Sequence, residues 1–135
     1  MESQDGSNFN ELLERWEETY KKGLLSFWML LLLAERPTYA FEMKGLVEEL
    51  SQGTLSADSN SLYRALNRFA QMGLITSQVQ PNSQGPDRRY YSLAPTGRRL
   101  LASFIRRNLL VFQSPSVAGK MAALASFQVE EDTHD

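Results

Sequence analysis

The stretch Asp58–Gly73, which reads DSNSLYRALNRFAQMG, decides the fold that we expect for this chain. Apolar side chains recur along it at helical spacing and predict one buried helix face, formed by Leu62, Leu66, Phe69 and Ala70. The short side-chain oxygen of Asp58 or Ser59 can cap the start of this helix, because it accepts from the free backbone N–H groups there. Gly73 supplies a stop, since glycine suits the left-handed residue that ends many helices.

The opposite face of this helix carries a polar stripe that contains no acid. The stripe consists of Asn60, Arg64, Asn67, Arg68 and Gln71. These side chains are rich in hydrogen-bond donors, which suit phosphates and the base edges of a major groove. We interpret the stretch as a DNA-recognition helix. An ordinary surface helix with a solvated polar face is the alternative.

Charge is strongly segregated along the chain, although the net charge of the 135 residues is only −2. Residues 1–20 hold six acids and one base, and residues 130–135 hold four acids. Residues 59–107 carry eight arginines and a single acid, Asp87, which makes this block +7. Because arginine suits phosphate contact, the segregation is compatible with a nucleic-acid partner despite the acidic total.

The amino-acid composition leaves several classes of site without their residues. The sequence has no cysteine, and its single histidine, His134, lies at the C-terminus. A disulfide framework, a zinc site and a histidine-based catalytic triad are therefore unavailable. No pair of acids, nucleophile–base set or phosphate-binding loop stands out, so we expect no enzyme, no cofactor and no metal. The lack of cysteine fits a reducing compartment, and we expect a cytoplasmic protein.

The N-terminal part of the chain predicts an acidic amphipathic helix followed by an apolar one. The first eight residues are polar and are expected to be frayed. A helical pattern then begins, formed by Phe9, Leu12, Leu13, Trp16 and Tyr20. Gly23–Ala34 is an apolar run of 12 residues, shorter than the roughly 18 of a membrane-spanning helix. We predict a buried core helix rather than a membrane anchor. Because a small domain can hardly cover a helix that is apolar all round, this run favours a dimer.

The next helix is predicted at Ala40–Leu50, after Pro37 has ended the first one. We expect Thr38 to cap it. Its apolar face is expected to consist of Phe41, Met43, Leu46, Val47 and Leu50. A glycine-containing turn at Ser51–Gly53 and a short extended piece at Leu55-Ser56 lead to the helix with the polar stripe. Two helices joined in this way match a helix-turn-helix.

A hairpin is predicted after Gly73. Leu74–Gln80 favours one strand, Pro81–Asp87 a turn-rich loop and Arg88–Leu93 the returning strand, whose Tyr91 and Leu93 are expected to face the core. Because the returning strand begins with two arginines, we interpret the hairpin as a wing along the sugar–phosphate backbone. A structural hairpin with incidental arginines is the alternative.

The last long helix is predicted from Gly97 to about Phe112, with Pro95 or Thr96 at its start. Its wide apolar arc favours pairing with a second copy of the chain. The expected interface residues are Leu101, Phe104, Ile105 and Phe112. The alternative is that this helix folds back on its own core. Val117–Val129 is expected to add a short helix.

We therefore divide the chain into four parts. Residues 1–22 are expected to form an N-terminal amphipathic helix or arm, and 23–95 a winged helix-turn-helix that binds DNA. Residues 96–129 are expected to form a C-terminal dimerisation helix with a short extension, and 130–135 an acidic disordered tail. The expected fold class is mainly α with a small β-hairpin wing, flanked by N- and C-terminal dimerisation helices.

Several spaced motifs carry a resemblance to a known family. They are Gly23-Leu24-Leu25, Leu30–Ala34 before Pro37, Phe41-Glu42, Ser61-Leu62-Tyr63 with Leu66, Gly73-Leu74-Ile75, and Arg89-Tyr90-Tyr91 with Leu93, Gly97 and Arg98. In this order and spacing, Leu25–Leu101 resembles the winged-helix domain of PadR-type bacterial and archaeal transcriptional regulators. The resemblance covers more than half of the chain.

The resemblance implies a dimeric winged helix-turn-helix, most often a repressor that binds a palindromic operator. It further implies dimerisation through the C-terminal helix, with help from the N-terminal one, and release of DNA by a small aromatic or drug-like effector, as in many members of the family. The sequence departs from the family where Ser59 and Asn60 replace a proline and a glycine, where Arg64 replaces a proline, and where Ala94 replaces a threonine. The first three changes lie where DNA contacts are expected, so we expect an altered sequence preference, with Arg64 strengthening binding.

The expected DNA contacts are of two kinds. The residues expected at base edges are Asn60, Ser61, Arg64 and Asn67. The residues expected at phosphates, which set position rather than sequence, are Lys44, Tyr63, Arg68, Arg88 and Arg89. For Tyr63 we also consider a ring that lies in the core, with only its hydroxyl reaching a phosphate.

Two further hypotheses remain open at the level of sequence. Trp16 and Trp28, together with Phe104, could line a pocket for a flat aromatic effector at the dimer interface, although ordinary core packing explains such residues equally well. The whole chain could also be a winged-helix module that binds protein and not DNA. The +7 block at residues 59–107 favours DNA over this alternative.

Overall fold

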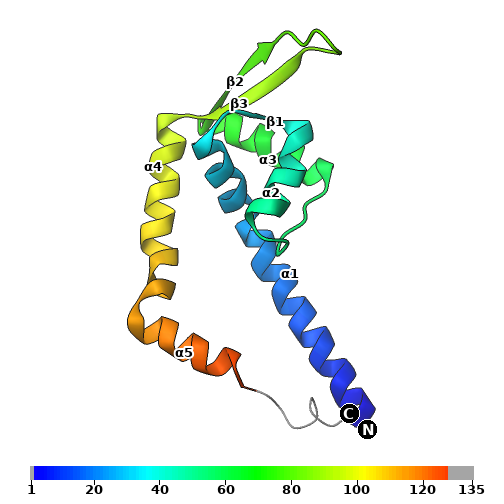
Figure 1. Ribbon diagram of the computed structural model, residues 1–135, viewed down its shortest axis with the longest axis vertical. Helices are drawn as coiled ribbons and strands as arrows, with labels where there is room; N and C mark the ends of the chain where they lie inside the picture. The colour runs from blue at the N-terminus through cyan, green and yellow to red at the C-terminus, as the bar shows by residue number, and fades with distance from the viewer. Residues whose placement is uncertain (1, 128–135) are drawn as a thin grey trace. The chain divides into compact units, whose positions relative to one another are not determined.

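The structure, a computed structural model, describes the backbone of residues 2–127 and the side chains of residues 8–127. It is mainly helical, with one small antiparallel sheet, and forms a winged helix-turn-helix (Figure 1). The elements are α1 (Glu2–Glu35), β1 (Thr38–Tyr39), α2 (Ala40–Leu50), α3 (Ser59–Gln71), β2 (Ile75–Gln80), β3 (Arg88–Leu93), α4 (Pro95–Phe104), a π-helical segment (Ile105–Leu109), a 3₁₀ segment (Leu110–Gln113) and α5 (Pro115–Ala125). They divide into two compact units, one ending at Leu101 and the other beginning at Ala102.

The amphipathic and apolar segments predicted near the N-terminus form one continuous helix, α1, of 34 residues. This helix begins at Glu2, so the prediction that the first eight residues are frayed was wrong. Once a helix has formed, each added residue gains one hydrogen bond, and no proline precedes Phe9 to prevent its extension. The apolar run is buried by the chain only at Met29, Leu30, Leu32 and Leu33. Within the residues that the structure describes, the run is therefore not covered on every side.

The helix-turn-helix consists of α2 and α3, which pack beside the C-terminal half of α1 (Figure 1). The predicted bounds of α2 are confirmed, but the predicted cap is not. The Thr38 hydroxyl instead donates to the Arg36 carbonyl oxygen at 3.2 Å, and the backbone N–H of Tyr39 donates to the Glu42 carboxylate at 3.4 Å. Thr38 does not cap the helix because it belongs to a strand.

That strand, β1, is the third member of a sheet whose order is β1–β3–β2. Thr38 pairs with Tyr91, and Tyr39 with Tyr90. The predicted hairpin is confirmed, with β2 beginning at Ile75, one residue later than expected. Two residues are too few to show the alternation that reveals a strand, so sequence reasoning missed β1.

The core of the larger unit joins α1, α2 and α3. Its most deeply buried large side chains are Met29, Met43, Val47, Leu62 and Leu66. The predicted buried face of α3 is confirmed at Leu62, Leu66 and Phe69, but Ala70 is exposed and Ala65 is buried in its place. Position 65 stands three residues from 62 and four from 69, which puts it on the same face.

The α-helical part of α4 ends at Phe104, earlier than the predicted end at about Phe112, and the π-helical and 3₁₀ segments follow it to Gln113. Ser114 then caps α5, because its hydroxyl accepts from the Val117 backbone N–H at 3.3 Å. α5 ends at Ala125, and residues 128–135, including the expected acidic tail, lie outside the described residues. None of the helices in the described part of the chain has the length and apolar character needed to cross a membrane.

Candidate nucleic-acid interface

The start of α3 is fixed by its predicted cap. The Asp58 carboxylate accepts from the Ser61 backbone N–H at 2.7 Å. This hydrogen bond, together with one from the Ser61 side chain, holds the pKa of Asp58 below its ordinary value, and the nearby Arg64 acts in the same direction. Gly73 follows the helix with a φ of +74°, as predicted for a glycine stop.

The polar stripe of α3 faces solvent along its whole length. The buried Leu62, Leu66 and Phe69 fix the orientation of the helix, so the five stripe residues at 60, 64, 67, 68 and 71 are all exposed. Arg64 Nη2 lies 3.4 Å from Ser61 Oγ, to which it donates. Ser61 itself is half-buried. A donor-rich surface of this kind is available to a ligand, and its contact with bases remains a prediction.

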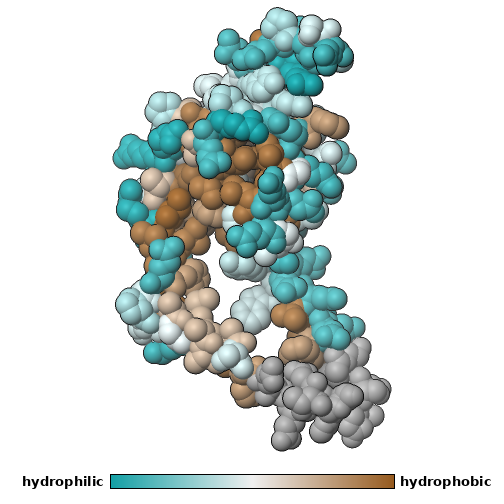
Figure 2. Space-filling model, viewed as in Figure 1, coloured by the Kyte–Doolittle hydropathy of each residue, from teal (hydrophilic) through white to brown (hydrophobic). Residues whose placement is uncertain are grey.

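The wing, which we define as β2, β3 and the loop between them, carries two arginines, and a neighbouring side chain holds each of them in place. Arg89 Nη1 donates to Ser77 Oγ at 3.0 Å across the hairpin. The Arg88 guanidinium carbon lies 4.4 Å from the ring centre of Tyr39, which meets Tyr90 edge-on at 5.3 Å. Both arginines are exposed, and Figure 2 shows hydrophilic side chains gathered over the wing at the top of the view.

The remaining phosphate candidates are also accessible. Lys44 is exposed on α2, and Arg68 is exposed on α3, where its guanidinium carbon lies 5.7 Å from the Phe69 ring centre. The Tyr63 side chain is 50% exposed, so its ring is not the core ring that we considered.

The arginines of α3 and the wing form no salt bridge within the part of the chain that the structure describes. A salt bridge joins Arg36 to Glu42 at 3.2 Å at the start of α2. Among the residues that the structure describes, no carboxylate lies within salt-bridge distance of the arginines of α3 or the wing. Their charge is therefore available to phosphates.

The residues predicted at the dimer interface and in the effector pocket lie in different environments. Leu101 is buried by the chain itself, with 6% of its surface exposed, whereas Phe112 is exposed. Trp16 is 76% exposed, and Trp28 is half-buried against the edge of Phe27 at 5.0 Å. Twelve residues of helix separate the two tryptophans by about 18 Å, so a single chain does not bring them together at one ligand.

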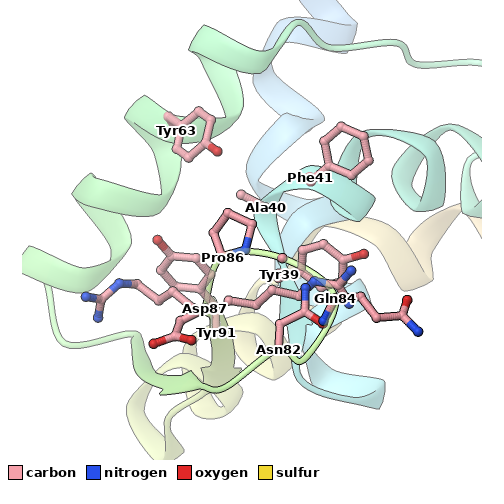
Figure 3. Close-up of a pocket in the computed structure, with 12 residues that line it drawn as sticks. Tyr39, Ala40, Phe41, Tyr63, Asn82, Gln84, Pro86, Asp87 and Tyr91 are labelled. Carbon is pink, nitrogen blue, oxygen red and sulfur yellow. The ribbon is translucent and has the colours of Figure 1, made fainter.

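Sequence reasoning missed a hollow of about 710 Å³ between α2, α3 and the wing (Figure 3). Its lining comes from Tyr39, Ala40, Phe41, Tyr63, Asn82, Gln84, Gly85, Pro86, Asp87, Arg88, Arg89 and Tyr91. Phe41, which was predicted to lie on the buried face of α2, is instead 87% exposed. It stands two residues from the buried Met43, or about 200° around a helix, and that spacing is the signal that would have placed it correctly.

Comparison with known proteins assigns the chain to a family. A model of the PadR-like family of transcriptional regulators matches residues 29–103, which include α2, α3, the wing and most of α4. Among curated proteins, none matches the sequence.

Three solved structures illustrate the similarity in fold. Bacillus subtilis PadR, solved in complex with operator DNA, matches with a TM-score of 0.56 and 20% identity over 61% of this chain and 46% of its own length. A transcriptional regulator from Clostridium thermocellum matches with a TM-score of 0.62 and 21% identity over 70% of this chain and 92% of its own. A PadR-family regulator from Eggerthella lenta matches with a TM-score of 0.61 and 20% identity over 90% of this chain and 99% of its own. The chain thus spans less than half the length of the Bacillus protein.

Proposed function

Because this chain belongs to the PadR-like family of transcriptional regulators, we propose that it regulates transcription by binding specific DNA sequences through α3 and the wing. The observation that carries the proposal is the exposed, acid-free stripe of α3 beside the two anchored arginines of the wing. The side chains proposed to read base edges are Asn60, Ser61, Arg64 and Asn67, and those proposed to contact phosphates are Lys44, Tyr63, Arg68, Arg88 and Arg89. The operator DNA bound to Bacillus subtilis PadR supports this type of partner. A regulator of this kind performs no catalysis.

We further propose that the active form is a homodimer that acts as a repressor on a palindromic operator. Exposed apolar side chains on the first half of α1, including Phe9, Leu12 and Trp16, are not covered by the residues that the structure describes. A second copy would supply that cover and place two α3 helices about one turn of DNA apart.

The third part of the proposal is that a flat aromatic effector binds the protein and releases it from DNA. Because Trp16 and Trp28 are far apart on one helix, a pocket that uses both must combine residues from two copies. Titration of tryptophan fluorescence with planar cationic and phenolic compounds tests this, and binding should weaken the complex with DNA. A broad panel without any response would leave both tryptophans as packing residues.

The experiment that tests DNA binding is a salt series on random-sequence duplex DNA by fluorescence anisotropy. We expect affinity to fall steeply as salt rises, because each neutralised phosphate releases a counterion. Arg88→Ala should weaken binding to all sequences alike and reduce the slope of log affinity against log salt by about one. Absence of wild-type binding at about 50 mM salt, where phosphate contacts are strong, would contradict the proposal.

A winged-helix module that binds protein is the second candidate, favoured by the exposed apolar side chains on the first half of α1 and by the overall acidity of the chain. The same salt series separates the two functions. A protein-binding module has no reason to bind duplex DNA in a salt-dependent way.

A further inference from the structure

The hollow between α3 and the wing has an unusual lining for an open surface. Two aromatic rings stand at its edge from different helices, Phe41 at the start of α2 and Tyr63 on α3. Figure 3 shows them above the wing loop that carries Asn82, Gln84 and Pro86. Phe41 is 87% exposed and Tyr63 is 50% exposed, and because both line the same hollow they form a shared aromatic surface for a partner rather than a single scattered apolar side chain.

The position of the hollow determines what that partner is once α3 is bound to DNA. In the proposed docking, α3 lies in a major groove and the wing beside it lies along the adjoining sugar–phosphate backbone. The two grooves of a duplex are separated by one sugar–phosphate strand, which must therefore cross the space between α3 and the wing. That space is the hollow, whose lining includes Tyr63 from α3 and residues of the wing.

We propose that the hollow seats one sugar–phosphate strand of the duplex, with Phe41 and Tyr63 packed against deoxyribose faces and Arg88 and Arg89 directed to the phosphates. This inference rests on the proposed function and adds Phe41 to the DNA-binding surface. Deoxyribose presents apolar C–H edges that suit aromatic rings, while the adjoining phosphates suit the two guanidinium groups.

The charge of the lining agrees with an anionic strand but is not optimal for one. Arg88 and Arg89 outnumber the single acid, Asp87, which lines the same hollow. Asp87 lies close enough to repel phosphates that the arginines attract. It therefore limits affinity for every DNA sequence, since the strand is the same at any site.

The test compares Phe41→Ala with the wild type on random-sequence duplex DNA across a salt series. We expect affinity to fall about tenfold, or about 1.4 kcal/mol, with an unchanged salt slope, because an apolar contact releases no counterion. Met72→Ala is the matched control: Met72 is also exposed, at 57%, but does not line the hollow, and its variant should bind like the wild type. Since Phe41 is almost fully exposed, its truncation should leave the melting temperature unchanged.

A second variant tests the effect of the acidic side chain in the lining of the hollow. Asp87→Asn should tighten binding to all duplexes, most clearly at low salt. If the wild type binds DNA and Phe41→Ala binds equally well, the proposed position of the strand in the hollow is wrong, while the proposed function stands. A changed salt slope in Phe41→Ala would also contradict the proposed position of the strand, whereas absence of wild-type binding would contradict the proposed function as well.

Discussion

Arg64 combines an exposed position on α3 with contacts that hold it in place. Its guanidinium donates to Ser61 Oγ at 3.4 Å, and its charge acts on Asp58 at the helix start. If Arg64 grips a guanine, Arg64→Ala should cost roughly 1–3 kcal/mol at the preferred sequence and little elsewhere. Selection of a preferred duplex followed by competition with random DNA measures this. Equal losses on both DNAs would make Arg64 a phosphate contact instead.

Tyr39 acts on the wing through Arg88. Its ring lies under the Arg88 guanidinium at 4.4 Å and meets Tyr90 edge-on. We expect Tyr39→Leu to weaken DNA binding by about 0.5–1 kcal/mol, the range of an exposed cation–π contact, and Tyr39→Phe to bind like the wild type because it keeps a ring. In an Arg88→Ala background most of the Tyr39→Leu effect should vanish. A loss that persists there would show that Tyr39 acts independently of Arg88.

Individual residues show where sequence reasoning works and where it stops. The Asp58 cap and the Gly73 stop were predictable because the chemistry of each lies within one helical turn. Phe41 was misplaced because its neighbours at 43 and 47 made a buried face appear wider than it is. The anchoring of Arg88 by Tyr39 spans 49 positions of sequence, and nothing local to either residue indicates it.

Among the elements, α3 depends on pH through its cap. The folded-state pKa of Asp58 is lowered from 3.8, so the charged cap contributes stability above that value and loses it as pH falls further. We expect the melting temperature of the wild type to fall more than that of Asp58→Asn below about pH 3.8, because asparagine caps a helix without titrating. Parallel curves for the two proteins down to pH 3 would contradict this role.

The start of α4 is held against the sheet at Gly97. A Cβ there would overlap the Leu74 carbonyl oxygen and come within 2.8 Å of Leu93 Cδ1. Gly97→Ala should therefore destabilise the fold by about 1–3 kcal/mol through overpacking, measured by urea unfolding. Gly45→Ala is the control: it has open space around its Cβ and lies within α2, so it should raise stability by about 0.5–1 kcal/mol. Equal stability of the two variants would contradict the close packing.

Elements whose limits are marked by nearby residues were predictable, whereas β1, which forms only by pairing with a distant strand, was not. The bounds of α2 and β3 match the prediction because proline, glycine and apolar spacing mark them locally. β1 exists because Thr38 and Tyr39 pair with Tyr91 and Tyr90, and that pairing diverted Thr38 from the capping role expected of it.

At the scale of the whole molecule, the fold class follows from the order of its elements, whereas the interface follows from their exposed faces. The +7 block was visible in sequence, and the structure adds that its arginines lack carboxylate partners among the described residues. The hollow was not visible, because it combines residues from β1, α2, α3 and the wing. Surfaces built from several elements require the fold before they can be described.

The exposed apolar side chains of the second unit lead to the last prediction, on assembly. Phe112 is 47% exposed, in a run with Leu110 and Val111 that are also exposed. We expect the wild type to have twice its chain mass of 15.3 kDa in solution, and Phe112→Asp to shift toward the monomer at equal concentration, because a charge placed in an apolar interface loses its hydration. Met72→Asp, which changes an exposed apolar residue of α3, should remain dimeric. Light scattering after size exclusion measures all three proteins, and a wild-type monomer, or a Phe112→Asp variant that stays dimeric, would remove Phe112 from the interface.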